Sequence, residues 1–131
     1  VFSTRQPTDN GFDFKLEGGN RIHGDIGSGS TWLTTAADAT FSYSINTWYH
    51  IAYVVNSSNS TYDIYVNGNI VEQGTMDAGT ALLCDALHKV SVGAYPNGGE
   101  YFNGKIDEVI PYQHGVHLFE NYTKKQKQNT I

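Results

Sequence analysis

Alternation of apolar and polar side chains limits the fold of this chain more than any other feature of its sequence. Phe12, Phe14 and Leu16 alternate with charged residues, and this period of two predicts a strand with one buried face and one wet face. A glycine-rich turn at residues 18–20 leads into a second alternating run at 21–26. The two runs together predict a β-hairpin.

Further strand signals follow in the middle of the chain. Residues 32–35 are a weaker candidate, whereas residues 48–55 carry aromatic or β-branched side chains on both faces. Such a run predicts a central strand that is covered on both sides, with Trp48 and Tyr53 in the core.

A second hairpin has the clearest turn signal. Alternation resumes at residues 62–66 and is followed by Asn67-Gly68. Because this dipeptide is the strongest short-range mark of a two-residue hairpin loop, we expect its partner strand at residues 69–73.

The last third of the chain is less regular. Residues 74–87 form a long connection of the kind that carries function or covers a sheet edge. Residues 89–94 alternate again, 96–99 predict a turn, and 101–112 contain the last long strand, in which a bulge or burial on both faces would explain the broken alternation. In the tail, residues 113–131, apolar side chains near helical spacing predict a short helical turn.

Length and charge restrict the function. A chain of 131 residues has the usual size of one domain, so we expect residues 1–131 to form a single domain. The net charge of -5 argues against a nucleic-acid binder. No apolar run is long enough for membrane insertion, and the single cysteine excludes an internal disulfide. The first residues lack the pattern of a signal peptide, and without an initiator Met the chain is expected to be a mature product or a fragment.

Three motifs follow one another in a characteristic order: Trp48-Tyr49-His50, Tyr65-Val66-Asn67-Gly68 and the segment from Phe102 to Glu108. In this order they resemble the laminin G-like, concanavalin A-like jelly-roll superfamily, over about residues 12–112. The resemblance implies an all-β fold, an antiparallel β-sandwich of two curved sheets. The alternation described above favours the same class independently.

The same resemblance implies that N-terminal strands of the family fold are lacking, because Val1-Phe2-Ser3 enters the family pattern after its opening strands. An open sandwich would expose core and strand edges. We therefore expect another chain, another segment or a compact rearrangement to supply the missing strands.

Members of this superfamily often bind carbohydrates, so the resemblance implies a polysaccharide or glycan as partner. Sugars pack their C–H faces on aromatic rings and need fixed polar groups for their hydroxyls. Half-buried aromatic residues of the sandwich are the alternative interpretation of these side chains. The candidate ligand-binding residues lie beside turns or in loops: Trp32, Tyr95, Asn97, Glu100, Tyr101 and Asn103.

Calcium is the cofactor that the resemblance implies. Asp107 matches the family pattern best, and Asp9 and Asp77 are loop carboxylates that could add oxygen ligands. Turn shaping, or for Asp107 a pair with Lys105, is the alternative interpretation.

Catalysis is not expected. Glycoside hydrolases of this fold place two carboxylates on one strand face, whereas Asp107 and Glu108 are adjacent and would point to opposite faces.

Two hypotheses about the function remain. The favoured one is a non-catalytic, calcium-assisted lectin-like module of a secreted or cell-surface protein. The alternative is a structural, adhesion or assembly domain of a surface, filament or phage-like particle.

Overall fold

The computed structural model describes residues 2–5, 11–81, 90–96 and 98–111. The regular elements in these ranges are all β-strands. In chain order the strands are β1 (Phe2–Ser3), β2 (Phe12–Glu17), β3 (Arg21–Gly27), β4 (Trp32–Thr34), β5 (Ala39–Thr40), β6 (Ile51–Asn56), β7 (Thr61–Val66), β8 (Asn69–Thr75) and β9 (Ser91–Val92).

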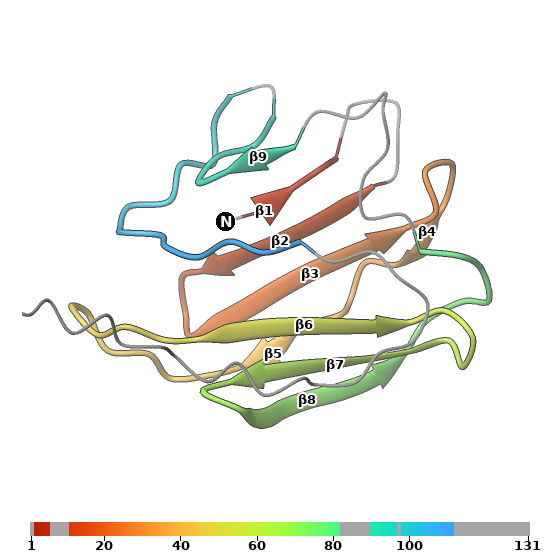
Figure 1. Ribbon diagram of the computed structural model, residues 1–131, viewed down its shortest axis with the longest axis horizontal. Helices are drawn as coiled ribbons and strands as arrows, with labels where there is room; N and C mark the ends of the chain where they lie inside the picture. The colour runs from red at the N-terminus through yellow and green to blue at the C-terminus, as the bar shows by residue number, and fades with distance from the viewer. Residues whose placement is uncertain (1, 6–10, 82–89, 97, 112–131) are drawn as a thin grey trace, which may run out of the picture.

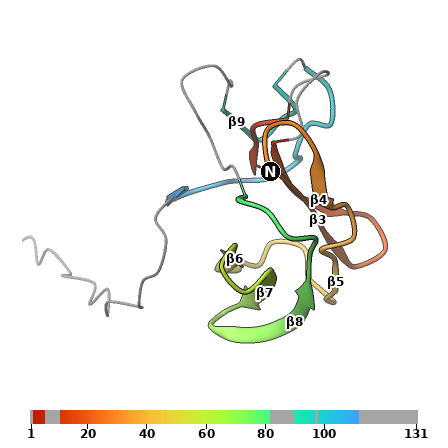
Figure 2. The same cartoon turned by 90° about the vertical axis from the view of Figure 1, so that its right-hand side faces the viewer.

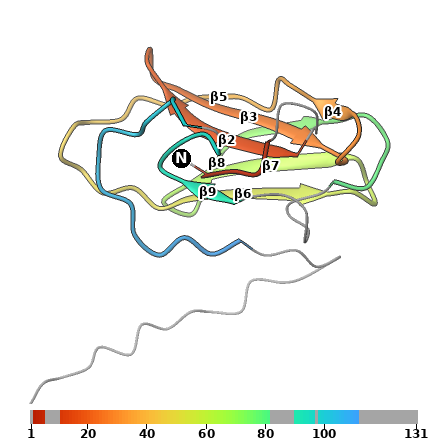
Figure 3. The ribbon, with the colours of Figure 1, turned by 90° about the horizontal axis from the view of Figure 1, so that it is seen from above.

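The strands form two antiparallel sheets. The larger has the order β4-β3-β2-β1-β9, with β5 also paired to β3, and the smaller has the order β6-β7-β8. Figure 1 shows β9, β1, β2 and β3 of the larger sheet above the smaller sheet, and Figures 2 and 3 show the structure from the side and from above. The predicted antiparallel β-sandwich is thus confirmed.

The predicted first hairpin is confirmed as β2 and β3. Phe12 pairs with Ile26 and Leu16 with Ile22, so the apolar residues of both strands share one face. That face points toward the smaller sheet and supplies much of the core, because burying such side chains is the main stabilising contribution to a sandwich. The buried apolar residues are Phe2, Phe12, Ile22, Ile26, Leu33, Ala37, Ala39, Tyr62, Ile64, Val66 and Met76.

The second predicted hairpin is confirmed as β7 and β8. Asn67 and Gly68 both adopt positive φ, 51° and 81°, as a tight two-residue hairpin turn requires. Alternation in β7 buries Tyr62, Ile64 and Val66 against the larger sheet.

The predicted central strand at residues 48–55 is wrong in its position. β6 begins at Ile51 and pairs only with β7 among the described strands, so it is an edge strand. The other edge of β6 therefore has no neighbour among the described strands, and Trp48, which lies before β6, is 63% exposed rather than in the core. Tyr53 does contact the core, with its ring edge-on to Phe12 and Phe14.

The predicted last long strand is also not formed over the residues described. Residues 101–111 contain no strand, and only Ser91–Val92 of the alternating segment 89–94 pairs, as β9 with β1. A strand needs a neighbour for its backbone N–H and C=O groups, and none of the described strands pairs with 101–111. The predicted helical turn in the tail lies outside the described residues.

Candidate functional site

The outer face of the β2–β3 hairpin carries six charged or titratable side chains. Because the register pairs each polar residue of β2 with a polar residue of β3, all six point away from the core. We call this surface the charged face; its residues are Asp13, Lys15, Glu17, Arg21, His23 and Asp25.

Part of this face is buried, contrary to the prediction that it would be wet. The side chains of Asp13 and Asp25, which pair across the two strands, are only 4% and 7% exposed. Arg5 covers them, with Nη1 at 3.8 Å from Asp13 and 3.6 Å from Asp25. The guanidinium of Arg5 also stacks on Trp32, 5.4 Å from the ring centroid, a favourable cation–π geometry.

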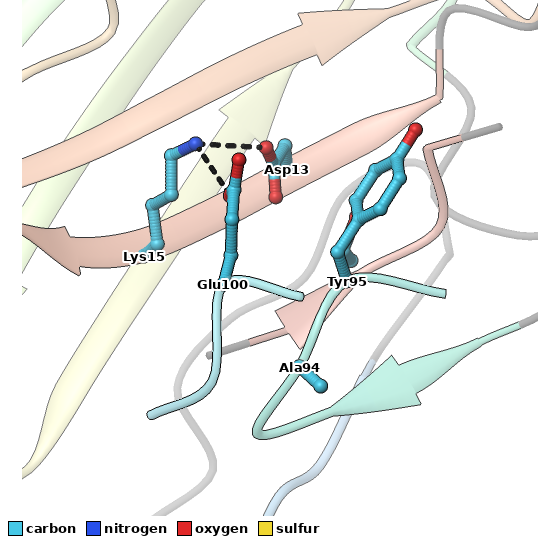
Figure 4. Close-up of a pocket in the computed structure, with 6 residues that line it drawn as sticks. Asp13, Lys15, Ala94, Tyr95 and Glu100 are labelled. Carbon is cyan, nitrogen blue, oxygen red and sulfur yellow. Dashed lines mark hydrogen bonds and ion pairs between the residues drawn. The ribbon is translucent and has the colours of Figure 1, made fainter. Parts of the chain in front are cut away.

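The loop after β9 covers the other part of the charged face. Its backbone is held by two hydrogen bonds: the Tyr95 N–H donates to the Gly99 carbonyl, and the Gly98 N–H donates to the Tyr95 carbonyl. Glu100 then adopts a positive φ of 48°, a conformation that non-glycine residues rarely adopt and that is often found at functional sites. Its carboxylate accepts a hydrogen bond from Lys15 Nζ at 2.9 Å (Figure 4).

A small hollow lies between this loop and β2 (Figure 4). Its volume of about 10 Å³ is enough for one water-sized group. Asp13 Oδ2 is buried and has no hydrogen-bond partner among the described residues, although Lys15 Nζ lies 3.5 Å away. We call this hollow the recess; it is lined by Ser3, Asp13, Lys15, Ala94, Tyr95 and Glu100.

His23 links two carboxylates at the other end of the charged face. Its Nδ1 lies 2.5 Å from Asp38 Oδ1, and its Nε2 lies 3.3 Å from Asp25 Oδ1. Arg21 Nη2 also donates to Asp38, at 2.5 Å. The result is a continuous chain of charged groups from Arg21 to Asp25.

The pKa values of these acids move in opposite directions. Burial raises the pKa of Asp25, with the Asp13 charge adding to the effect and His23 opposing it. For Asp38, burial is outweighed by hydrogen bonds from Arg21 and His23, so its pKa is lowered. The hydrogen bond from Lys15 lowers the pKa of Glu100.

The recess brings together part of the predicted ligand-binding set. Tyr95 and Glu100 line it, and Trp32 is connected to it through Arg5. Tyr101 is 77% exposed in the same loop, and Asn103 is exposed just after it. The remaining candidate, Asn97, lies outside the described residues.

Sequence analysis missed Ser3, Arg5, Asp13 and Lys15. The alternating acids and bases of β2 and β3 predict an ordinary face toward solvent. A signal was nevertheless present, since charged residues make up only 16% of the chain and six charged or titratable residues fall on one hairpin face.

Neither of the two predicted calcium ligands that the structure describes lines this recess. Asp107 is exposed and accepts a hydrogen bond from the Glu108 N–H, while Asp77 is exposed and its N–H donates to the Leu33 carbonyl. Asp9 lies outside the described residues. Within the described ranges, no three His, Cys, Asp or Glu side chains are grouped as metal ligands would be. Calcium binding stays a prediction.

A second, shallower hollow lies on the outer side of β6 and β7. It has a volume of about 310 Å³ and is lined by His50, Ala52, Tyr65 and Gly68. It offers an aromatic ring and an imidazole but lacks the charged groups of the recess.

Comparison with known proteins gives one result. Residues 1–115 match a laminin G-type family model, described as the concanavalin A-like lectin/glucanases superfamily. No curated protein and no solved structure matches the chain. In the part of the chain that the structure describes, no helix is long and apolar enough to span a bilayer.

Proposed function

Because the chain belongs to the concanavalin A-like lectin/glucanases superfamily, we propose that it is a non-catalytic carbohydrate-binding module and that a glycan binds over the recess. The observation that carries this proposal is the buried Asp13 Oδ2, which has ion-pair contacts but accepts no hydrogen bond within the described residues, beneath a loop that presents aromatic side chains. A buried acceptor without a hydrogen bond is costly, and a ligand hydroxyl that reaches it gains the full bond.

The groups around the recess suit a sugar. One hydroxyl fits the hollow, where it donates to Asp13 and accepts from Lys15 Nζ. The rest of the sugar lies outside, across Tyr95 and the exposed ring of Tyr101. Aromatic faces provide the apolar surface on which sugar C–H groups pack.

The same geometry argues for binding rather than hydrolysis. Asp13 and Asp25 pair across two strands, and a glycosidase would need both carboxyl groups to flank the scissile bond. Both side chains are covered, and the recess admits only one water-sized group. A glycosidic oxygen with a sugar on each side does not fit between them.

The proposal includes the wider setting inferred from the sequence. Laminin G-like domains are often extracellular, so we place the module in a secreted or cell-surface protein. Calcium assistance, through Asp107, Asp9 and Asp77, belongs to this proposal as a separate step that binding at the recess does not require.

An assembly domain is the second candidate function, and one observation favours it. Among the described strands β6 has one free edge, and Trp48 and Val54 beside this edge are exposed. Free edges of this kind accept a strand from another chain or segment. This function predicts self-association and no glycan binding.

A glycan and polysaccharide array, run with calcium and again with a chelator, tests the proposal. We expect saturable binding that weakens about fivefold in Tyr95→Ala, because a lost stacking contact is worth about 1 kcal/mol. Trp48, an exposed aromatic residue in the segment before β6, provides the matched control, and Trp48→Ala should bind like the wild type. Loss of glycan binding in the presence of chelator would show that binding also requires calcium. A blank array with folded protein would overturn the proposal in favour of an assembly domain.

A further inference from the structure

In the described part of the chain, the basic side chains in and near the recess and along the charged face are all paired with acids. Lys15 Nζ contacts Glu100 at 2.9 Å, Asp13 at 3.5 Å and Glu17 at 3.8 Å. Arg5 is shared between Asp13 and Asp25, and Arg21 is shared between Glu17 and Asp38. An incoming anion would have to displace one of these carboxylates before it could form an ion pair.

The acids outnumber the bases. Arg5, Lys15 and Arg21 face five carboxylates, so the cluster has two more acids than permanently charged bases. The five are Asp13, Glu17, Asp25, Asp38 and Glu100. The net charge of the whole chain, -5, has the same sign. The local and overall fields therefore both repel anions.

The recess itself needs a hydrogen-bond donor. Asp13 lines it, and Asp13 Oδ2 is buried and accepts no hydrogen bond within the described residues, although Lys15 Nζ and Arg5 Nη1 lie 3.5 and 3.8 Å away. A sugar hydroxyl or a protonated amine can donate to it, whereas an ionised carboxylate or sulfate can only accept. Glu100, 58% exposed at the rim, adds a second acceptor that an acidic sugar would meet first.

From these observations we propose that the recess selects glycans without acidic groups, so that neutral and amino sugars bind and uronic or sulfated sugars are rejected. This inference rests on the proposed function, since it assigns the ligand class of the same site. The selectivity comes from Asp13 inside the recess and Glu100 at its rim.

An array of glycan pairs that share a backbone but differ in charge tests the inference. Glucan is paired with glucuronan, galactan with galacturonan, and the N-acetylated chitin hexamer with its deacetylated, amine-bearing form, all at about 0.15 M salt, where surface charges act only over short range. We expect each acidic member to bind at least tenfold more weakly than its neutral partner. The amine-bearing hexamer should bind at least as well as the acetylated one.

Two substitutions at the rim locate the effect. Glu100→Lys should reduce the affinity difference between acidic and neutral glycans by about tenfold. Glu100→Gln, which keeps the size of the side chain, should reduce this difference less. Glu108→Lys makes the same charge change at an exposed position outside the recess and should leave the difference unchanged.

The outcomes separate the two levels of the proposal. If no glycan of any charge binds, the proposed function fails and this inference fails with it. If acidic members bind as tightly as their neutral partners, or if Glu108→Lys reduces the difference as much as Glu100→Lys, glycan binding stands and the charge selectivity of the recess is refuted.

Discussion

Lys15 on β2 and Glu100 in the loop after β9 form an ion pair, with 2.9 Å between Nζ and Oε2, although 85 positions separate them in the sequence. The pair fastens the loop to the larger sheet and so closes one side of the recess. It also directs the carboxylate of Glu100 inward from a backbone with positive φ. The candidate site therefore depends on a tertiary contact more than on any local motif.

Glu100→Gln should loosen this loop while changing global stability little. Because Glu100 is more than half exposed, solvent screens the pair, and its loss should cost less than about 1 kcal/mol of unfolding free energy. The Tyr95 and Gly98 amides, which hold the loop, should exchange hydrogen faster. Hydrogen exchange and urea unfolding measure the two effects, with Glu108→Gln as control. Unchanged exchange at both amides would mean that the ion pair does not hold the loop.

Asp25→Asn should stabilise the protein at neutral pH. Burial raises the pKa of Asp25, so the folded state binds this proton more tightly than the unfolded state. The free energy of unfolding then falls as pH rises from the ordinary pKa of an aspartate through the raised one. An asparagine side chain does not ionise, so the variant does not lose this free energy of unfolding as pH rises. Urea unfolding should show a more stable variant at pH 7 and a smaller advantage near pH 4. A variant that is less stable at pH 7 would contradict the prediction.

Asp38→Asn should have the opposite effect. Hydrogen bonds from Arg21 and His23 outweigh burial and lower the pKa of Asp38, so its ionised form contributes stability above the ordinary pKa of an aspartate. That contribution is lost as pH falls through the lowered value. The variant should therefore be less stable than the wild type at pH 7, and the difference should shrink in acid. The two substitutions, compared in one pH series of urea unfolding curves, provide controls for each other.

Local patterns predicted the parts of the fold whose strands are neighbours in sequence. Alternation located β2, β3 and β7, and the turn at Asn67-Gly68 fixed the second hairpin. Such hairpins need only short-range information, because the turn sets the register. The edge position of β6 depends on which strands lie beside it, and residues 48–55 contain no information about that.

The candidate site was predicted in part for the same reason. Tyr95 and Glu100 stand beside a turn, where exposed aromatic and polar residues are visible in the sequence. Asp13 was assigned to a wet face because its neighbours alternate, yet Arg5 and the loop after β9 cover that face. Only the tertiary structure brings this loop over β2.

Gly24→Ala should test how closely the two sheets pack. A Cβ at Gly24 would lie 2.3 Å from Tyr53 Oη and 2.7 Å from Cζ, and Tyr53 is held in place by its hydrogen bond to the Ala37 carbonyl. Overpacking of this kind costs about 1–3 kcal/mol. Gly18→Ala is the control, because its Cβ would meet no atom within 4 Å and should change stability by less than about 0.5 kcal/mol. Equal effects in chemical denaturation would show that Tyr53 does not pack against Gly24.

Two isoleucines on neighbouring strands test which face of the smaller sheet is the inner one. Ile64 on β7 is fully buried, whereas Ile70 on β8 is 49% exposed. Ile64→Ala should lower the free energy of unfolding by about 2–5 kcal/mol, because it removes buried methyl groups and leaves a cavity beneath the larger sheet. Ile70→Ala removes the same atoms from a half-open position and should cost less than about 1 kcal/mol. Urea unfolding of both variants measures the difference. Similar losses for the two would mean that the outer face of β7 and β8 is also covered in solution, as the assembly-domain alternative requires.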